Sequence, residues 1–337
     1  MNTEMPELHT LTELPAKSSV LVQQPRSPSR PSWRSLAILI PFLVLFVALS
    51  IGSGPFLTSG NLLNILDQQS ATLIIAAAGT LVLISGGIDL SVGATYALAG
   101  VVSAQTAQAH GIVPALLAGL LVGVAVGAIN GLVSTFLRIN PLIATLAMSF
   151  IVSGIASMVS NGNLIVLTDE PDFAKIAQAD FLSVRTSVWI ALVIVAILGV
   201  LLARTTIGRY VYAAGGNAEA ARLAGIRVYA VRIMAFTISG AAAAIGGIID
   251  TSRVLSAQSS SGTALTFTVL AGIVVGGTSI LGGEGAIWRT AVGVLFIALV
   301  GNGFNLLGIN ALYQQIALGV ILLVAVGIDA WSRVLRR

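Results

Sequence analysis

Groups that could do chemistry are sparse in this sequence, and they form no familiar catalytic constellation. The 337 residues include 13 acidic, 17 basic and two His residues but no Cys, so neither a disulfide nor a thiolate metal site can form. Neither of the two lysines, Lys17 and Lys175, follows a GxxxxG pattern, and HExxH, CxxC and GxSxG are all absent. We therefore predict no metal site, no catalytic residue and no nucleotide-binding loop in this chain.

A lone carboxylate, Asp89, lies in the segment Ser85–Gly93, which reads SGGIDLSVG between two apolar runs. The glycines break a helix, and Asp89 can cap the helix that follows through a side-chain oxygen. Because a carboxylate in lipid is costly and marks a functional site by default, Asp89 and Ser91 are candidate lining residues of a translocation pathway. The alternative is that Asp89 lies near a membrane surface and only caps.

A second glycine-rich run, Val275–Gly285, reads VGGTSILGGEG and predicts another broken helix or re-entrant turn. Its Gly-Gly pairs resemble those of Ser85–Gly93, which is a weak indication of an internal repeat. Downstream, Asn302, Asn305 and Gln314 supply neutral hydrogen-bonding groups. These groups either line a pathway for a hydroxyl-rich solute or join neighbouring helices.

The polar stretch Arg204–Arg232 carries five of the 17 basic residues and separates two apolar runs, so we expect it to lie in water. Asn217 and Gly225 are typical of a helix N-cap and a C-terminal stop, and they predict a short helix at about 217–224. This helix contains the pattern EAAxxxG, formed by Glu219, Ala220, Ala221 and Gly225. Its small side chains could enter a groove of another protein, but an ordinary surface helix could have the same sequence.

Small residues recur at every fourth position in the apolar run between His110 and Arg138. They are Gly111, Ala115, Gly119, Gly123, Gly127 and Gly131. On a helix this spacing gives one smooth stripe, which lets the backbone of another helix approach closely. We therefore assign Gly119, Gly123, Gly127 and Gly131 to helix packing.

The composition makes lipid the natural solvent of most of the chain. Hydrophobic residues make up 56% and charged residues 9%, whereas about 25% charged residues is usual for a soluble domain. The Pro- and Ser-rich residues 1–34 predict a disordered cytoplasmic tail, and residues 35–337 predict one transmembrane domain. The net charge of +4 follows the membrane and does not indicate a nucleic-acid partner.

The apolar runs predict an all-α polytopic membrane protein, with broken or re-entrant segments near residues 85–93 and 275–285. A spanning helix needs about 20 mostly apolar residues, so the longer runs must each hold two helices. The predicted count is ten, at about 36–53, 66–86, 89–109, 112–138, 141–160, 187–204, 231–250, 264–281, 287–307 and 311–330.

The distribution of positive charge orients this arrangement. Ten spans place both termini and the loop at 205–230 on one side of the membrane. That side holds Lys17, Arg26, Arg30, Arg34, Arg138, Arg204, Arg209, Arg222, Arg227, Arg232, Arg289, Arg333, Arg336 and Arg337. The other side keeps only Lys175, Arg185 and Arg253. Because basic loops stay inside, we predict that both termini are cytoplasmic and that the acidic loop 168–180 lies outside.

Three stretches of the sequence resemble one known family. LVLISGGIDLSVGATYALAG (81–100), YAAGGNAEAARLAGIRV (212–228) and VVGGTSILGGEGAIWRTAVG (274–293) are similar to the permease subunits of bacterial ribose/galactose-type ABC importers. The resemblance extends over nearly all of the chain after about residue 36. It implies an inner-membrane protein of about ten helices, in which the chemistry of ATP belongs to another subunit.

The resemblance also implies partners and a coupling site. They are a cytoplasmic ABC ATPase, which binds ATP and Mg²⁺, a second permease subunit in a homo- or heterodimer, and a periplasmic sugar-binding protein. It makes Glu219–Gly225 the helix that docks on the ATPase. The predicted coupling residues are Gly208, Arg209, Asn217, Glu219, Ala220, Ala221 and Gly225. Residues 262–271 depart from the family because they lack an acidic pair that its members commonly carry there.

The sequence-based hypothesis is therefore the transmembrane subunit of an ATP-driven importer of a monosaccharide or polyol, working by alternating access. One alternative is a secondary transporter driven by an ion gradient, which would need a buried carboxylate such as Asp89. Another is a passive channel for a small neutral solute. Neither the sugar nor the identity of the dimer partner follows from the sequence.

Overall fold

The structure, a computed structural model, describes residues 38–310 and 312–334. Within these ranges the chain forms thirteen α-helices and two small two-stranded sheets. The tail predicted at residues 1–34 lies outside the described residues. The helices are α1 Leu39–Gly52, α2 Ser59–Ile84, α3 Val92–His110, α4 Ile112–Phe136, α5 Pro141–Val159, α6 Pro171–Gln178, α7 Thr186–Arg204, α8 Thr206–Gly216, α9 Ala218–Leu223, α10 Val228–Val254, α11 Thr263–Val275, α12 Ile287–Leu306 and α13 Leu312–Val334.

The helical class agrees with the prediction, but the count of ten spans is not confirmed. Among the described residues, six helices are long and apolar enough to cross a membrane: α2, α4, α5, α7, α10 and α12. Three more apolar segments, Leu39–Gly52, Thr263–Val275 and Leu312–Gly327, are shorter; they form α1, α11 and the first part of α13. Two boundaries also differ: α11 ends at Val275 and not near residue 281, and α2 begins at Ser59 and not near residue 66. The hydroxyl of Thr58 accepts a hydrogen bond from the Asn61 N–H at 3.3 Å and caps this earlier start.

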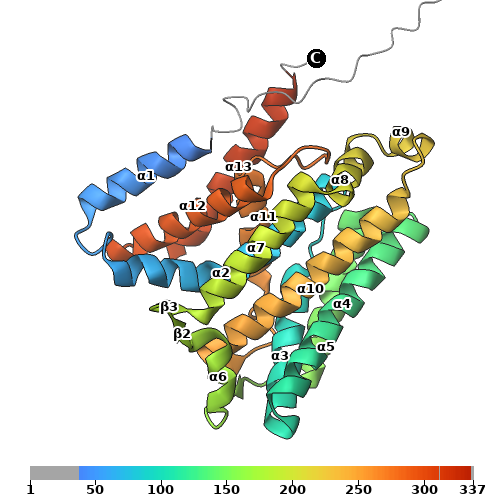
Figure 1. Ribbon diagram of the computed structural model, residues 1–337. Coiled ribbons are helices and arrows are strands. Elements are labelled where there is room, and N and C mark those ends of the chain that lie inside the picture. Colours follow the sequence, from blue (N-terminus) through green and yellow to red (C-terminus); the bar gives the residue numbers. More distant parts are fainter. Residues whose placement is uncertain (1–37, 311, 335–337) are drawn as a thin grey trace, which may run out of the picture.

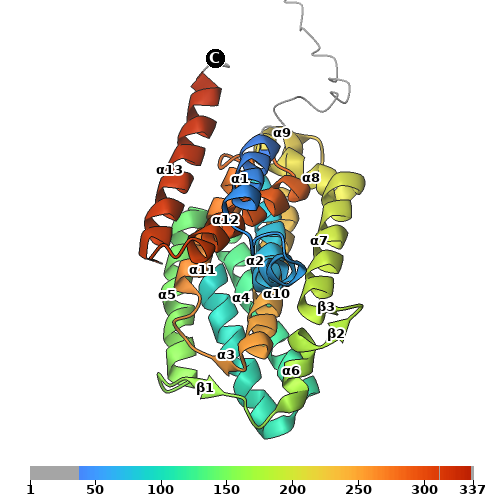
Figure 2. The ribbon, with the colours of Figure 1, turned by 90° about the vertical axis from the view of Figure 1, so that its left-hand side faces the viewer.

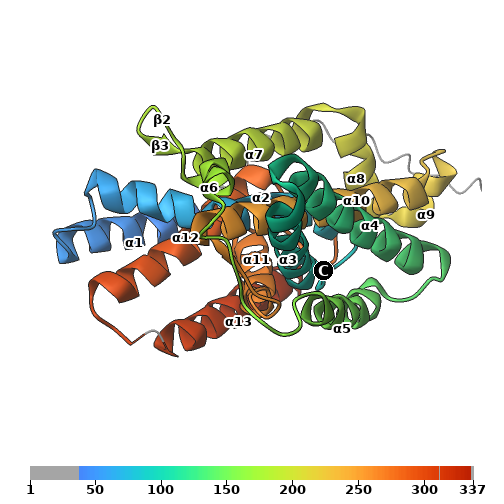
Figure 3. The ribbon, with the colours of Figure 1, turned by 90° about the horizontal axis from the view of Figure 1, so that it is seen from below.

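Helix α10 runs through the middle of the bundle and packs on α2, α3 and α4. Figure 1 shows α10 lying along α4, and Figure 3 shows α10 crossing the centre when the molecule is seen from below. Helices α5 and α7 flank opposite sides of this centre (Figure 2). The core is mostly Ala, Ile, Leu and Val, with Phe236 of α10 fully buried.

The contact between α4 and α10 depends on glycine. A Cβ at Gly123 would lie 2.3 Å from the Gly240 carbonyl oxygen, and one at Gly127 would lie 2.4 Å from the carbonyl oxygen of Phe236. At Gly131 the nearest atom would be the Ile233 Cα at 2.7 Å. The stripe that the sequence places on this helix therefore faces α10, and any larger side chain there would force the two backbones apart.

The outer faces of the bundle are apolar. Leu121 of α4, Phe150 of α5 and Ile197 of α7 are 65%, 74% and 58% exposed. Many exposed hydrophobic side chains on several helices are unusual for a protein surrounded by water. The same faces suit lipid tails, which agrees with the membrane setting predicted from composition.

The lower end of the bundle in Figure 1, which we call the α6 end, carries structure that the sequence analysis expects to be loop. Helix α6 begins at Pro171 and buries Phe173 and Ala177. Strand β1, Ile165–Val166, pairs antiparallel with β4, Ser256–Ala257. Strands β2, Asp180–Phe181, and β3, Val184–Arg185, form a hairpin. The opposite end carries α8 and α9, and we call it the α9 end.

Candidate functional site

A polar cavity of about 480 Å³ opens between α2, α11, α12 and α13. Side-chain carboxamides dominate its polar lining, and we call it the amide cavity. They come from Asn61, Asn64, Gln68, Gln69, Asn302, Asn305, Gln314 and Gln315, joined by the hydroxyl of Thr268. Ligand pockets usually have volumes of about 300–1,000 Å³, so the space is sufficient for a small solute.

Two pairs of carboxamides tie the walls of the amide cavity together. Asn61 donates to the Asn302 Oδ1 at 3.2 Å, and Asn302 donates back to the Asn61 Oδ1 at 2.8 Å. Across α12 and α13, the Gln314 Nε2 donates to the Asn305 Oδ1 at 3.0 Å. These bonds join helices, and they still leave lone pairs and N–H groups for other partners.

The remaining four carboxamides of the cavity are free to meet a solute. In the part of the chain that the structure describes, no side-chain hydrogen bond involves Asn64, Gln68, Gln69 or Gln315. Each carboxamide offers two N–H donors and a carbonyl acceptor with two lone pairs. A wall of this kind can both donate to and accept from hydroxyl groups, without placing a charge beside them.

The structure places Asn302, Asn305 and Gln314 together in this cavity, and it adds residues that the sequence analysis does not single out. On α2, Asn61, Asn64 and Gln68 follow each other at spacings of three and four residues, so they share one helical face. That spacing is the signal that could have identified them. A search for charged residues passes over neutral amides.

The segment between α2 and α3 breaks the helix as predicted, but Asp89 does not cap α3. Helix α2 ends at Ile84, Gly86 has φ +84°, and the N-cap of α3 is Ser91. The Asp89 carboxylate instead accepts from the Ser91 N–H at 3.0 Å and from the Ser91 hydroxyl at 2.7 Å. The Asp89 side chain therefore closes a local turn with the residue two positions later, and it does not cap α3.

Three further helices hold the same segment. The Ser239 hydroxyl of α10 donates to the Asp89 Oδ2 at 2.9 Å. From α4, the Asn130 Nδ2 donates to the Ser91 Oγ at 2.7 Å. The Thr145 hydroxyl of α5 donates to the Ile88 carbonyl at 3.0 Å. The charge of Asp89 is therefore stabilised by three hydrogen bonds from protein donors, as a buried carboxylate requires.

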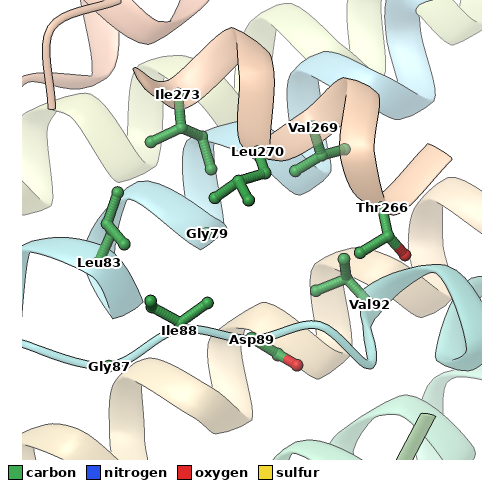
Figure 4. Close-up of a pocket in the computed structure, with 10 residues that line it drawn as sticks. All are labelled: Gly79, Leu83, Gly87, Ile88, Asp89, Val92, Thr266, Val269, Leu270 and Ile273. Atoms are coloured by element: carbon green, nitrogen blue, oxygen red, sulfur yellow. The ribbon is translucent and has the colours of Figure 1, made fainter. Parts of the chain in front are cut away.

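Asp89 borders only a small space. Figure 4 shows Gly87 and Ile88 across a gap from Val269 and Ile273 of α11, with the Asp89 carboxyl directed away from α11. The cavity there has a volume of about 20 Å³, which is room for roughly one water molecule. The predicted pathway residues therefore fall at two places: Asp89 and Ser91 lie at the helix break, whereas Asn302, Asn305 and Gln314 lie in the amide cavity.

Both helix breaks meet the end of α8 at one point, which we call the glycine junction. It consists of Gly86, Gly215, Gly216, Gly282 and Gly283. The Gly283 N–H donates to the Ile84 carbonyl at 2.8 Å. A Cβ on Gly215 would lie 1.7 Å from that same carbonyl oxygen, and one on Gly283 would lie 2.7 Å from the Gly216 Cα. The contact is therefore backbone against backbone.

Side chains reinforce the glycine junction from both sides. The Arg232 Nε of α10 donates to the Ser85 carbonyl at 3.2 Å. The Tyr212 hydroxyl of α8 donates to the Gly285 carbonyl at 2.8 Å. Burial raises the pKa of Tyr212, so the hydroxyl keeps the proton that it donates. Helix α8 is thus bonded to the second break and lies in contact with the first.

The short helix predicted at about 217–224 is present as α9. The Asn217 side chain accepts from the Ala220 N–H at 3.0 Å, and Gly225 follows the helix with φ +83°. Ala221 is buried, whereas Glu219, Ala220 and Arg222 face outward. Glu219 and Arg222 form an exposed ion pair at 2.6 Å, and this hydrogen bond raises the pKa of Arg222.

The remaining predicted coupling residues lie where α7 turns into α8. Gly208 is buried, and a Cβ there would lie 2.0 Å from the Leu202 carbonyl oxygen. The Thr205 hydroxyl caps α8 by accepting from the Gly208 N–H at 3.2 Å. Arg209 is exposed on the next turn. Gly208 therefore allows the sharp turn that presents Arg209 and α9 at one end of the bundle.

Comparison with known proteins agrees with this arrangement. Residues 61–326 match the family described as branched-chain amino acid transport system / permease component. The chain belongs to this family. The matched range contains all three stretches on which the resemblance to sugar permeases rests, and that resemblance is confirmed by individual relatives.

Three curated relatives are similar over most of their length. The ribose import permease RbsC of Escherichia coli K12 is 39% identical over 296 residues, which cover 86% of this chain and 92% of the relative. The L-arabinose transport system permease AraH of the same organism is 37% identical over 306 residues, with 90% and 93% covered. The probable ABC transporter permease y4mJ of Sinorhizobium fredii is 36% identical over 301 residues, with 88% and 90% covered. No solved structure matches the chain significantly.

Proposed function

We propose that this chain is the transmembrane subunit of an ATP-binding-cassette importer that moves a monosaccharide or a related polyol. The family is one of permease components, and two of the relatives are permeases for ribose and L-arabinose. The observation that carries the proposal is the amide cavity, because its polar groups are the neutral donors and acceptors that a sugar requires. ATP and Mg²⁺ bind to a partner ATPase, and this chain supplies the path.

The solute path runs through the amide cavity. Carboxamides that are free of protein partners, such as Asn64 and Gln68, bond the hydroxyl groups of the solute. The pairs Asn61–Asn302 and Asn305–Gln314 hold the walls, and they can exchange their bonds for bonds to a sugar when the helices move. We assign Asp89 and Ser91 to the helix break and not to the path, because the cavity beside Asp89 admits only about one water.

The proposed orientation places the α9 end in the cytoplasm of a bacterium and the α6 end in the periplasm. Arg209, Arg222 and Arg227 are exposed at the α9 end, and basic loops favour the cytoplasmic side. The ten predicted spans all overlap helices of the structure, with α1, α3, α11 and α13 joining the six that are long and apolar enough to cross a membrane. Both termini then lie in the cytoplasm, and the protein is a multi-pass protein of the inner membrane.

Coupling begins at α9. We propose that the outward face of this helix, with Glu219, Ala220 and Arg222, docks on the ATPase. A second permease subunit, identical or related, pairs with this chain, and a periplasmic binding protein delivers the sugar. Closure of the ATPases on ATP moves α8, and the glycine junction passes this movement to both helix breaks. The cavity then changes from facing the periplasm to facing the cytoplasm.

The test reconstitutes the chain with its ATPase and binding protein in proteoliposomes and measures uptake of D-ribose, L-arabinose and D-galactose. Uptake of one of these sugars should require both partners and ATP. Uptake by the chain alone would indicate a channel. Uptake that needs an ion gradient but no ATPase would indicate a secondary transporter.

Charge reversal tests the docking helix. Glu219→Arg should abolish capture of the ATPase by the permease. A matched control exists at the other end of the bundle, where Asp172 and Lys175 form the same exposed i,i+3 ion pair on the short helix α6. Asp172→Arg should leave capture unchanged. Equal capture by the Glu219→Arg variant and the native chain would remove α9 from the proposed interface.

A further inference from the structure

A second polar cavity, of about 210 Å³, lies at the α6 end between α3, the last turns of α10 and strand β4. It is separate from the amide cavity and shares none of its lining residues. Small residues of α3, Ala97 and Gly100, form part of its wall. Its polar lining comes from Tyr96, Asp250, Thr251, Ser256, Gln258 and Ser261.

Asp250 is the charged group of this cavity, and its hydrogen bonds fix its position. Its Oδ1 accepts from the Arg253 Nε at 3.1 Å and from the Arg253 Nη2 at 2.5 Å. Its Oδ2 accepts from the Tyr96 hydroxyl. A carboxylate has about four acceptor sites, so these three bonds leave one site on Oδ2 for a further donor.

Arg253 neutralises the carboxylate without entering the cavity. It is not among the lining residues, whereas Asp250 is, and the two side chains are 27% and 25% exposed. The local net charge is therefore zero. A free cation or anion would find no unpaired opposite charge here, whereas a neutral solute with hydroxyl groups can form hydrogen bonds with the polar lining.

The rim of the cavity supplies groups of the same kind. The Gln258 side chain is exposed and, in residues 38–310 and 312–334, makes no hydrogen bond, so its donors and its acceptor are available. The Ser261 hydroxyl donates to the Gln258 carbonyl at 2.9 Å and can still accept. The Ser256 hydroxyl lies on β4, which pairing with β1 holds in place.

The position of the cavity relates it to the solute path. Ser261 lies two residues before α11, and Ala264 and Thr268 on the first turns of α11 line the amide cavity. The start of α11 thus borders both spaces. The second cavity is less than half the volume of the first, about 210 Å³ against 480 Å³, which suits one small molecule held closely.

We propose that the Tyr96–Asp250 cavity binds one neutral polyhydroxyl molecule at the periplasmic end, as an entry site ahead of the amide cavity. The free lone pair of Asp250 accepts a solute hydroxyl, and Gln258 donates to and accepts from its neighbours. This inference rests on the proposed sugar transport and the proposed orientation. The chemical class of the ligand follows from the carboxylate, carboxamide and hydroxyl groups that line the space.

The natural absence of Cys allows a clean labelling test. Gln258→Cys reports on the Tyr96–Asp250 cavity, Thr268→Cys reports on the amide cavity, and Asn163→Cys is an exposed control outside both. The full-length permease is reconstituted, and the labelling rate with a charged methanethiosulfonate is measured in D-ribose, L-arabinose, D-galactose or glycine. The sugar that slows labelling of Thr268→Cys is then used for Gln258→Cys.

When the sugar concentration is about ten times the Kd of a site, the unoccupied fraction of that site falls roughly tenfold. Labelling of Gln258→Cys should therefore slow by about the same factor. Glycine should have no effect, and labelling of Asn163→Cys should not change. Adding Asp250→Asn should weaken protection at Gln258→Cys and leave protection at Thr268→Cys. Tyr96→Phe removes one donor but keeps the carboxylate. It should retain protection at both labelled positions, which would show that the fold tolerates a change here.

Protection at Thr268→Cys without protection at Gln258→Cys would overturn the entry site and leave the proposed function standing. Protection at neither position by any of the three sugars would count against both proposals. Slower labelling of Gln258→Cys by the binding protein without sugar would make this surface a protein contact, and that would also overturn the entry site.

Discussion

Asn64 and Gln68 are two of the three carboxamides on α2 that line the amide cavity and make no side-chain hydrogen bond within the described residues, so they should bond the solute directly. Replacing each by Ala removes hydrogen bonds worth about 0.5–1.5 kcal/mol. The KM for the transported sugar should therefore rise about two- to tenfold per substitution, since 1.4 kcal/mol is a factor of ten. Asn163→Ala, an exposed amide outside the cavity, is the control, and initial uptake rates are the measurement. An unchanged KM in both variants would move the solute path elsewhere.

Asp89 separates ATP-driven import from ion-coupled transport. In Asp89→Asn the new carboxamide can still accept from Ser91, and it can donate to the Ser239 hydroxyl, so the helix break should persist. Uptake should be retained, with a loss of about 1–2 kcal/mol in unfolding free energy because bonds to a charged acceptor are the stronger ones. Uptake and thermal unfolding are measured on the same preparation. A well-folded variant without uptake would favour the ion-coupled alternative.

At the residue level, local signals could be predicted from the sequence and spatial ones could not. Asn217 and Gly225 bound α9 because a cap acts within one turn of its own helix. The capping role offered for Asp89 is wrong because α3 begins at Val92 with Ser91 in the N-cap position. The other partner of the Asp89 carboxylate, Ser239, lies 150 residues away in the chain and gives no local signal. The same is true of Asp250, since its pairing with Tyr96 brings together residues 154 positions apart.

Among the described helices, α4 and α10 share the most extensive contact, and a change in side-chain volume can test it. Gly123→Ala would place a methyl group 2.3 Å from the Gly240 carbonyl oxygen. Overpacking of this kind costs about 1–3 kcal/mol, so the midpoint of thermal unfolding should fall. Gly154→Ala on α5, where a Cβ meets nothing within 4 Å, controls for the higher helix propensity of Ala. Equal midpoints would show that α4 and α10 are not held this closely.

Helix α8 offers a matched pair of glycines at the glycine junction. A Cβ on Gly215 would lie 1.7 Å from the Ile84 carbonyl oxygen, whereas one on Gly216 meets nothing within 4 Å. Gly215→Ala should retain capture of the ATPase but lose sugar uptake, because α8 would be displaced from both breaks. Gly216→Ala should retain both. Normal uptake with Gly215→Ala would show that movement reaches the breaks by another route.

Elements that form by pairing across the chain were the ones that sequence reasoning missed. The breaks at Ser85–Gly93 and Val275–Gly285 were predicted because glycine acts locally. Strands β1 and β4 could not be predicted, because a strand of two residues shows no periodicity. They also pair residues that are far apart in the chain, such as Ile165 with Ala257. Helix α6 falls within the predicted acidic loop 168–180. Only two of its residues, Phe173 and Ala177, are buried, and two positions are too few to show a helical pattern in the sequence.

At the scale of the whole molecule, the two ends of the bundle carry different features. The α9 end carries charged, exposed residues, and the α6 end carries the Tyr96–Asp250 cavity. The glycine junction lies between the α8–α9 region and the helix breaks. The amide cavity is lined by α2 and α12, which adjoin the two breaks. A movement imposed at one end therefore has a continuous route through contacting elements to helices that line the amide cavity.

Every polar group that the structure places in the wall of the amide cavity is a neutral carboxamide or hydroxyl. An elementary charge that crosses a membrane gains or loses about 2.3 kcal/mol for each 100 mV of potential. A neutral sugar in contact with neutral groups carries no such charge, so the membrane voltage does no work on it. Accumulation of the sugar then depends on ATP alone, and a cell whose membrane has been depolarised can continue to import it.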